Sequence, residues 1–247
     1  MSLIREFESS GNWLFKYRGQ LPVVLFILAL PVIYFTDYSS ILSSTSCYIK
    51  AIAISLSILG MSIRAYTIAT TPKGTSGRNR DEQVAESLNN TGIYSLMRHP
   101  LYFANYLIWI GIVAYTQNIY FVIIITLAFW LYYERIMMAE ERYLHTQFGD
   151  RFLDWSAQLP AFIPSFKNYK PSNVSFSFRS ILRREYASAL STVIGFCYVD
   201  FLINYFTKEE LTIHYYWKIS LICTIVLAIL MRTLRRKTTL LDNKNRP

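Results

Sequence analysis

The stretch that decides the fold runs from Thr91 to Pro164. It begins TGIYSLMRHPLYFANYLIWIGI (residues 91–112) and ends YYERIMMAEERYLHTQFGDRFLDWSAQLPAFIP (residues 132–164). Two apolar runs within it are joined only by TQN, which predicts a tight helical hairpin over about residues 100–133. Ionisable and aromatic side chains gather at both far ends of this hairpin. Charge at the mouth of a membrane hairpin is costly to place, so we expect a functional site there.

The composition indicates a membrane protein. Hydrophobic residues make up 53% of the 247 residues and charged residues only 17%, whereas charged residues are about 25% of a typical soluble domain. Apolar runs that recur along the chain predict an all-α polytopic bundle of about six transmembrane helices, with a cytoplasmic extension after the fourth. These runs cover residues 21–35, 48–69, 100–115, 119–133, 187–206 and 216–234.

The basic residues predict the orientation of this bundle. Apart from Arg64, Lys50, Lys208 and Lys218, every Lys and Arg lies in segments that a six-helix chain places on one side. Because positive charge favours the cytoplasmic side, we expect both termini and the candidate site in the cytoplasm. Arg64 is expected to extend to the membrane surface. The net charge of +9 therefore reflects membrane orientation, and no nucleic-acid partner is predicted.

The cysteines indicate neither a disulfide nor a metal centre. Cys47, Cys197 and Cys223 lie in or beside apolar runs and form no CxxC or metal-ligand spacing, so we expect three buried thiols and no metal. The chain is expected to divide into four parts. These are a membrane core (1–166, with a signature region at 90–165), a basic cytoplasmic linker (167–186), an additional transmembrane hairpin (187–236) and a basic tail (237–247).

The two ends of the central hairpin carry the chemistry. Arg98, His99 and Pro100 stand where the third helix enters the membrane, and Glu140 and Glu141 lie beyond the exit of the fourth. A tight hairpin returns both groups to one surface, where they combine a cation, an imidazole and paired carboxylates with nearby tyrosines. This composition suits a zwitterionic, aromatic cofactor beside a lipid headgroup. Taken separately, a His-Pro pair is usually a helix cap and a Glu pair is usually a solvated face.

The same residues carry a family resemblance. TGIYSLMRHPLYFAN resembles the RHPxYxG signature of the isoprenylcysteine carboxyl methyltransferase and phospholipid methyltransferase group, and EERYLHTQFGDRFLDW with PAFIP is similar to its EExxL…FGxxYxxY…P…IP pattern. The chain departs from the pattern at Ala104, where Gly is usual, and at Phe152 and Trp155, where Tyr is usual. The resemblance implies a small α-helical membrane bundle that binds S-adenosylmethionine at its cytoplasmic face.

A narrower resemblance lies in two other segments. FESSGNWLFKYRGQLP (residues 7–22) and TSGRNRDEQVAESLNNTGIYS (residues 75–95) look like bacterial members described as lipid A 1-phosphate methyltransferases. This implies an enzyme of the bacterial inner membrane that methylates the 1-phosphate of lipid A. Alternatives within the group are a prenylcysteine carboxyl O-methyltransferase and a phospholipid N-methyltransferase. Two alternatives lie outside this group. One is a membrane oxidoreductase that uses NADPH, like the sterol reductases, and the other is a transporter or assembly factor.

The resemblance also implies roles for named residues. Glu140 or Glu141 would meet the amino group of S-adenosylmethionine, and a cation or the start of a helix would meet its carboxylate. The predicted cofactor-binding residues are Arg98, His99, Pro100, Tyr102, Asn105, Glu140 and Glu141.

Residues other than these are expected to bind the methyl acceptor. Methyl transfer to a phosphate or carboxylate needs no base, and an arginine fork is the natural clamp for a phosphate. Arg135 is the first candidate for this clamp, followed by Arg78 and Arg142, and Asn79 could bind the acceptor beside them. An ammonium acceptor would instead need a base, for which His99 or the glutamates could serve. We therefore predict Arg135 and His99 as catalytic residues.

Overall fold

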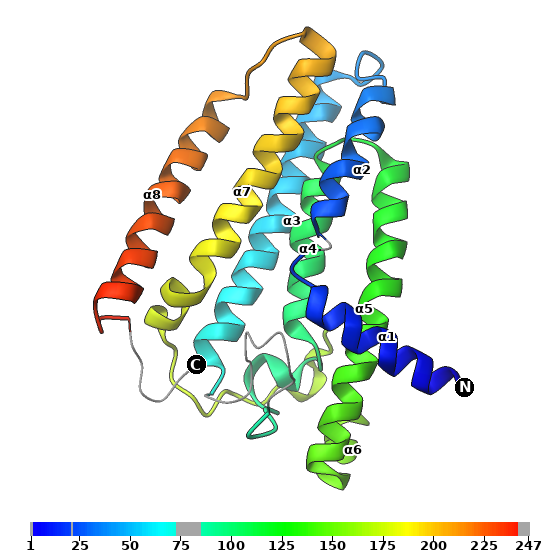
Figure 1. Cartoon of the computed structure of the whole chain (residues 1–247), viewed down its shortest axis with the longest axis vertical. Coiled ribbons are helices and arrows are strands. Elements are labelled where there is room, and N and C mark those ends of the chain that lie inside the picture. Colours follow the sequence, from blue (N-terminus) through cyan, green and yellow to red (C-terminus); the bar gives the residue numbers. More distant parts are fainter. Residues whose placement is uncertain (1, 21, 73–84, 242–247) are drawn as a thin grey trace.

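The computed structural model describes residues 2–20, 22–72 and 85–241 (Figure 1). Within these residues the chain is helical and contains no strand, which confirms the predicted all-α fold. The α helices are α1 (Leu3–Tyr17), α2 (Pro22–Phe35), α3 (Ser43–Thr70), α4 (Pro100–Ala114), α5 (Ile119–Phe148), α6 (Asp150–Ser156), α7 (Phe178–Lys208) and α8 (Tyr215–Lys237). Two short 3-10 helices cover Gly92–Ser95 and Phe166–Asn168.

All six predicted apolar runs are helical. In the described part of the chain, α3, α5, α7 and α8 are long and apolar enough to cross a membrane, and α2 and α4 are apolar but shorter. The 15 residues of α4 extend about 22 Å, less than the ~30 Å hydrocarbon core of a bilayer. Helix α5, with 30 residues, continues past the N-terminal end of α4.

Local sequence explains the central hairpin. Helix α4 begins at Pro100. Proline fits this position because a backbone N–H in the first turn of a helix has no partner within the helix, so the N–H that proline lacks is not missed. Asn118 caps α5, since its side-chain oxygen accepts a hydrogen bond from the Phe121 N–H at 3.0 Å. Gly149, with φ of 55°, ends α5 well beyond its apolar half. The prediction that the fourth helix continues past the apolar run is thus confirmed.

Small residues bring α3 and α4 close together. A side chain at Gly60 would collide with the Ala104 carbonyl, and one at Gly111 would collide with Ser57 and the Ala53 carbonyl. Ser57 also donates a hydrogen bond to the Ile108 carbonyl at 2.9 Å. Ala104 is fully buried at this contact, so the substitution of Ala for the usual Gly is accommodated.

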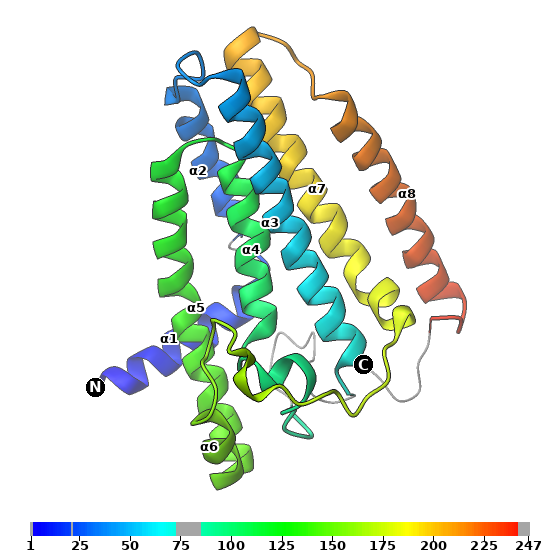
Figure 2. The ribbon, with the colours of Figure 1, turned by 180° about the vertical axis from the view of Figure 1, so that it is seen from behind.

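Helix α1 lies across the long helices and packs against α5 (Figures 1 and 2). Gly11 allows this contact, because a Cβ there would come within 2.2 Å of the Arg135 carbonyl oxygen. Tyr132 donates a hydrogen bond to the Leu14 carbonyl at 3.2 Å. The other face of α1 exposes Leu3 and Trp13, as expected of an amphipathic helix at a membrane surface.

Two expectations need correction. Helix α7 begins at Phe178, so the second half of the segment expected as a linker (167–186) is part of a helix. Cys197 is buried as expected, but Cys47 and Cys223 are exposed. These two thiols lie on outward faces of α3 and α8.

Candidate functional site

The start of α4 is held in place by the segment that follows α6. The backbone N–H groups of Arg98 and His99 donate to the carbonyls of Pro160 and Ala161, each at 3.0 Å. The Ser165 N–H donates to the Leu96 carbonyl at 2.9 Å. The RHP and PAFIP segments, far apart in sequence, therefore form one backbone unit that fixes where the imidazole lies.

The side chains at this point form a compact polar group, which we call the His99 cluster: Arg98, His99, Tyr102, Glu140 and Glu141. His99 Nε2 lies 2.8 Å from Glu141 Oε1, and its Nδ1 lies 3.5 Å from Glu140 Oε2. Tyr102 donates a hydrogen bond to Glu140 Oε1 at 2.5 Å. Arg98 Nε lies 2.9 Å from Glu141 Oε1. The hairpin thus brings together the cation, imidazole and paired carboxylates that the sequence predicted for its two ends.

The electrostatics of the cluster favour a charged imidazole. Burial by itself would lower the pKa of His99, but hydrogen bonds and charge interactions with Glu140 and Glu141 outweigh it and raise the pKa above its usual value. With His99 protonated, two cations face two carboxylates. The side chains of Glu140 and Glu141 are each 25% exposed, so a ligand can reach them.

A second layer of residues supports the cluster. The Asn105 amide donates to the Tyr133 hydroxyl at 3.4 Å, and the rings of Tyr133 and Tyr102 lie 4.8 Å apart. Arg64 of α3 donates to Asn105 Oδ1 at 2.5 Å and forms an ion pair with Glu185 of α7 at 2.8 Å. Arg64 is therefore bound inside the bundle, where we expected it to extend to the membrane surface.

Sequence reasoning missed the role of Arg64 and Glu185. The signal that could have found them is an arginine inside one apolar helix and an acid near the start of another. Opposite charges at membrane depth usually pair. Which two helices would meet was not readable from the sequence.

The predicted acceptor residues lie apart from the cluster. Arg135 donates to the Leu131 carbonyl at 2.8 Å, and its guanidinium lies 4.9 Å from the centre of the Phe7 ring of α1. Arg142 is exposed and pairs with Glu8 of α1 at 3.1 Å. Both arginines therefore face α1, and their predicted roles stay predictions. Arg78 and Asn79 lie outside the described residues.

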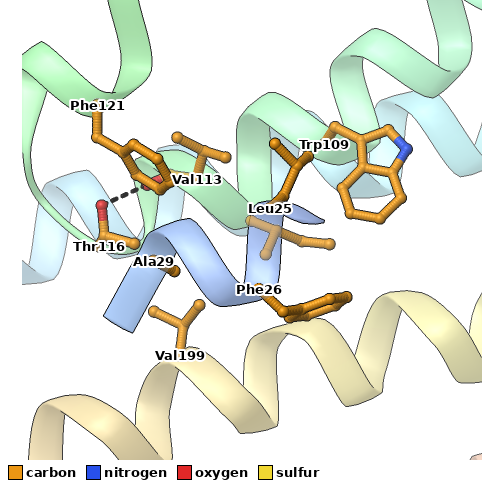
Figure 3. A pocket seen from close by; sticks show the side chains of 9 residues that line it. Leu25, Phe26, Ala29, Trp109, Val113, Thr116, Phe121 and Val199 are labelled. Atoms are coloured by element: carbon orange, nitrogen blue, oxygen red, sulfur yellow. Dashed lines mark hydrogen bonds between the residues drawn. The ribbon is translucent and has the colours of Figure 1, made fainter. Parts of the chain in front are cut away.

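A separate pocket lies between α2, α4, α5 and α7, near the α4–α5 turn (Figure 3). It is lined by Leu25, Phe26, Ala29, Trp109, Ile112, Val113, Thr116, Phe121 and Val199. Its one hydroxyl, on Thr116, donates to the Val113 carbonyl at 2.7 Å. The pocket offers only apolar contacts and includes no residue of the His99 cluster, so we place the chemistry at the cluster.

The fold and the cluster define a polytopic helical membrane protein with a charged, aromatic site at one end of its central hairpin. Residues 48–151 match the family described as Phospholipid methyltransferase. The matched segment runs from α3 to the start of α6 and contains the whole His99 cluster. This confirms the resemblance to the isoprenylcysteine carboxyl methyltransferase and phospholipid methyltransferase group, and it supports a membrane methyltransferase.

Two curated proteins are similar over half of the chain. The cobalt-zinc-cadmium resistance protein CzcN of Cupriavidus metallidurans is 30% identical over 123 residues, which are 50% of this chain and 54% of that protein. The nickel-cobalt-cadmium resistance protein NccN of Alcaligenes xylosoxydans xylosoxydans is 31% identical over 123 residues, 50% of this chain and 55% of its own length. The chain thus spans about half the length of these relatives. No solved structure matches significantly.

Proposed function

We propose that the protein transfers a methyl group from S-adenosylmethionine to an oxygen of a membrane lipid, and that the His99 cluster forms the cofactor site. The observation that carries this proposal is the contact of His99 with both Glu140 and Glu141 within the segment that matches the methyltransferase family. A His-Pro pair or a Glu-Glu pair that occurs alone is often only structural. Here they meet in space, in a partly open group of charges.

The residues present suit this cofactor. The carboxylates of Glu140 and Glu141 can receive an ammonium group, and Arg98 and His99 can receive a carboxylate. The rings of Tyr102 and Tyr133 stand beside these charges, where aromatic faces attract a sulfonium cation. Among the described residues, two buried side-chain donors have no hydrogen-bond partner, Arg98 Nε and the indole Nε1 of Trp155. Arg98 Nε forms the ion pair with Glu141, and Trp155 lies one residue before the Ser156 carbonyl to which Arg98 Nη1 donates. When bound, S-adenosylmethionine supplies an electrophilic methyl group.

The protonation of His99 favours an oxyanion acceptor. Against the effect of burial, hydrogen bonds and charge interactions with Glu140 and Glu141 raise the pKa of His99 and so favour its charged form, in which the imidazole donates hydrogen bonds and cannot act as a base. A phosphate or carboxylate oxygen is already ionised and needs no base, whereas an ammonium lipid must first lose a proton. The chain's contribution is then to place the reactants and to exclude water.

The surroundings of the site suit a lipid headgroup. Helix α1 packs against α5 through Gly11 and exposes Leu3 and Trp13 away from this contact. An amphipathic helix with such a face lies in the membrane interface. This would place the His99 cluster at the depth where headgroups meet water, within reach of a lipid acceptor and a soluble cofactor.

The acceptor we propose first is the 1-phosphate of lipid A, and the second is a prenylcysteine carboxylate. The test supplies purified protein in detergent with S-adenosylmethionine that carries a labelled methyl group, together with total membrane lipid extract. We expect label in lipid A that mild cleavage of phosphate esters releases. Label in a prenylated thiol acid or an amine lipid would keep the enzyme class and replace the acceptor.

The same assay can reject the enzyme class. Absence of both label and cofactor binding in the wild-type protein would overturn the proposed methyltransferase. Binding of NADPH in its place would then favour the reductase alternative.

A further inference from the structure

Helix α7 follows the segment that matches the methyltransferase family, yet it contributes a buried charge beside the candidate site. Glu185 of α7 is 4% exposed. It receives two hydrogen bonds from Arg64 of α3, one from Nε at 2.8 Å and one from Nη2 at 3.0 Å. This bidentate contact is the strongest geometry available to an arginine and a carboxylate.

The remaining edge of the guanidinium points to the site. Arg64 Nη1 donates to Asn105 Oδ1 at 2.5 Å. With its oxygen occupied in this way, Asn105 directs its NH2 group to the Tyr133 hydroxyl, 3.4 Å away. Glu185 thus sets the plane of Arg64, and Arg64 sets the orientation of Asn105.

From Tyr133 the chain of contacts reaches the cluster. The Tyr133 ring lies 4.8 Å from the Tyr102 ring, and Tyr102 donates to Glu140 at 2.5 Å. The contacts run from α7 through α3, α4 and α5, and every member touches the next. One end is the acid of the last hairpin, and the other is a carboxylate proposed to hold the cofactor.

Stability alone does not account for this ion pair. Two charges removed from water regain little net free energy, and a well-packed apolar pair of similar volume is often as stable or more so. The guanidinium of Arg64 binds Glu185 on one side and the Asn105 side chain on the other, and an apolar pair could not bind Asn105 in this way. The guanidinium fixes the direction of a polar side chain at the wall of the site.

We propose that Glu185 and Arg64 are positioning residues of the methyl-transfer site, so that α7 completes a site whose reacting groups lie elsewhere. They act through Asn105 and Tyr133. These two residues fix the position of the Tyr133 and Tyr102 rings beside the carboxylates that receive the cofactor. This inference rests on the proposed function. It assigns the last hairpin a role in cofactor binding and turnover.

The test compares two variants of the full chain with a control on the same helix. Arg64→Lys keeps the charge opposite Glu185 and removes the fork that also holds Asn105. The double variant Arg64→Met with Glu185→Met replaces the pair by apolar side chains. The control is Asp200→Asn, because Asp200 is a buried acid of α7 that is 1% exposed and binds His214, away from the site.

Three quantities are measured for each protein: the thermal unfolding midpoint, equilibrium binding of S-adenosylmethionine, and kcat/KM for methyl transfer. We expect the double variant to unfold near the wild-type temperature but to lose about 10- to 100-fold in kcat/KM, the effect of a wall group displaced by about 1 Å. Arg64→Lys should bind the cofactor more weakly without unfolding. Asp200→Asn should unfold at a lower temperature with unchanged equilibrium binding of the cofactor.

The outcomes separate the two proposals. A folded double variant with wild-type binding and turnover would show that the pair is only structural and would overturn the inference, while the proposed function would stand. If the double variant does not fold, Arg64→Lys is used instead: a folded Arg64→Lys protein with wild-type binding and turnover would overturn the inference. Wild-type protein without binding or transfer would overturn the proposed function, and the inference with it.

Discussion

At the scale of single residues, His99 organises the site. Its two ring nitrogens face two carboxylates, at 2.8 Å and 3.5 Å, and its backbone N–H is held by the Ala161 carbonyl. Its position and its charge state are thus set by different parts of the chain. The residue-scale predictions therefore concern charge at this histidine and at the groups around it.

Replacement of Glu141 by Gln should weaken cofactor binding without unfolding the protein. The change removes the charge that faces His99 and Arg98 and keeps the shape. A lost charge-assisted hydrogen bond is worth about 1.5–3 kcal/mol, so the dissociation constant for S-adenosylmethionine should rise about 10- to 100-fold. Equilibrium dialysis with labelled cofactor measures this. Glu134→Gln, an exposed position on the same helix, is the matched control, and equal affinities in both variants would refute the assignment.

The stability of the protein should depend on pH through His99. Because its folded pKa is raised, its contribution is complete below the unfolded pKa of about 6.5 and is lost as pH rises through the folded value. Above about pH 6.5 the wild-type unfolding midpoint should therefore fall more steeply than that of His99→Gln. Thermal unfolding across pH 5 to 9 measures both slopes, and parallel slopes would contradict the charged imidazole.

Arg135 offers a test of the phosphate clamp predicted from the sequence. If it binds the acceptor, Arg135→Lys should lower acceptor turnover by about 10-fold or more, because lysine lacks the planar fork, and should leave cofactor binding intact. Steady-state kinetics with the acceptor varied, beside direct cofactor binding, separates the two effects. Equal losses in turnover and cofactor binding would argue against a clamp. Unchanged turnover would agree with its observed contact with Phe7.

At the scale of elements, the site depends on how α1, α4 and α5 meet. The four-residue connection (residues 115–118) makes α4 and α5 antiparallel neighbours, and α5 then extends past α4 to carry Glu140 and Glu141. Helix α1 covers the other side of this extension through Gly11. Its packing is specific, because the backbone of α5 occupies the place of a side chain.

A side chain at Gly11 should therefore separate α1 from α5. In Gly11→Val the new Cβ would lie 2.2 Å from the Arg135 carbonyl oxygen, a backbone atom that cannot rotate away. We expect a loss of about 1–3 kcal/mol of stability and faster proteolysis within residues 1–20. Ser9→Val, on the exposed face of α1, is the control for helix propensity. Equal protease resistance in the two variants would contradict the contact.

At the scale of the whole molecule, α7 carries a buried acid toward each end. Glu185 lies near the His99 cluster, and Asp200 binds His214 in the connection to α8 at 2.8 Å. Their separation of 15 positions in the sequence corresponds to about 22 Å along a helix, a large part of a bilayer core. The arrangement suits a bundle with one polar layer near each membrane surface.

Orientation can be tested by labelling single cysteines in a variant without Cys47, Cys197 and Cys223. In spheroplasts of a bacterial expression host, a membrane-impermeant maleimide should label Glu210→Cys, in the connection between α7 and α8. Lys167→Cys, in the segment after α6, should react only after lysis, since basic segments favour the cytoplasm. Both positions are exposed. The reverse pattern would show that the predicted orientation is wrong.

Much of the fold was predictable because it depends on local patterns. The apolar runs predicted the helices, and Pro100 stands at the first residue of α4. The meeting of His99 with Glu141 followed from the TQN turn, since two helices joined by so short a turn must lie side by side. The pairing of Arg98 and His99 with Pro160 and Ala161 was not predictable, because a long stretch of chain separates them.

The sequence by itself determined the helical membrane class, the central hairpin and the charged and aromatic content of its open end. Only the tertiary structure decided which face of α5 looks inward. Arg135 follows Tyr133 by two residues, a turn of about 200° around the helix, so the two side chains point to opposite sides. The tertiary structure also decided that Glu185 of α7 pairs with Arg64 of α3. A contact between distant helices depends on how all of them pack together, and no short-range pattern in the chain specifies it.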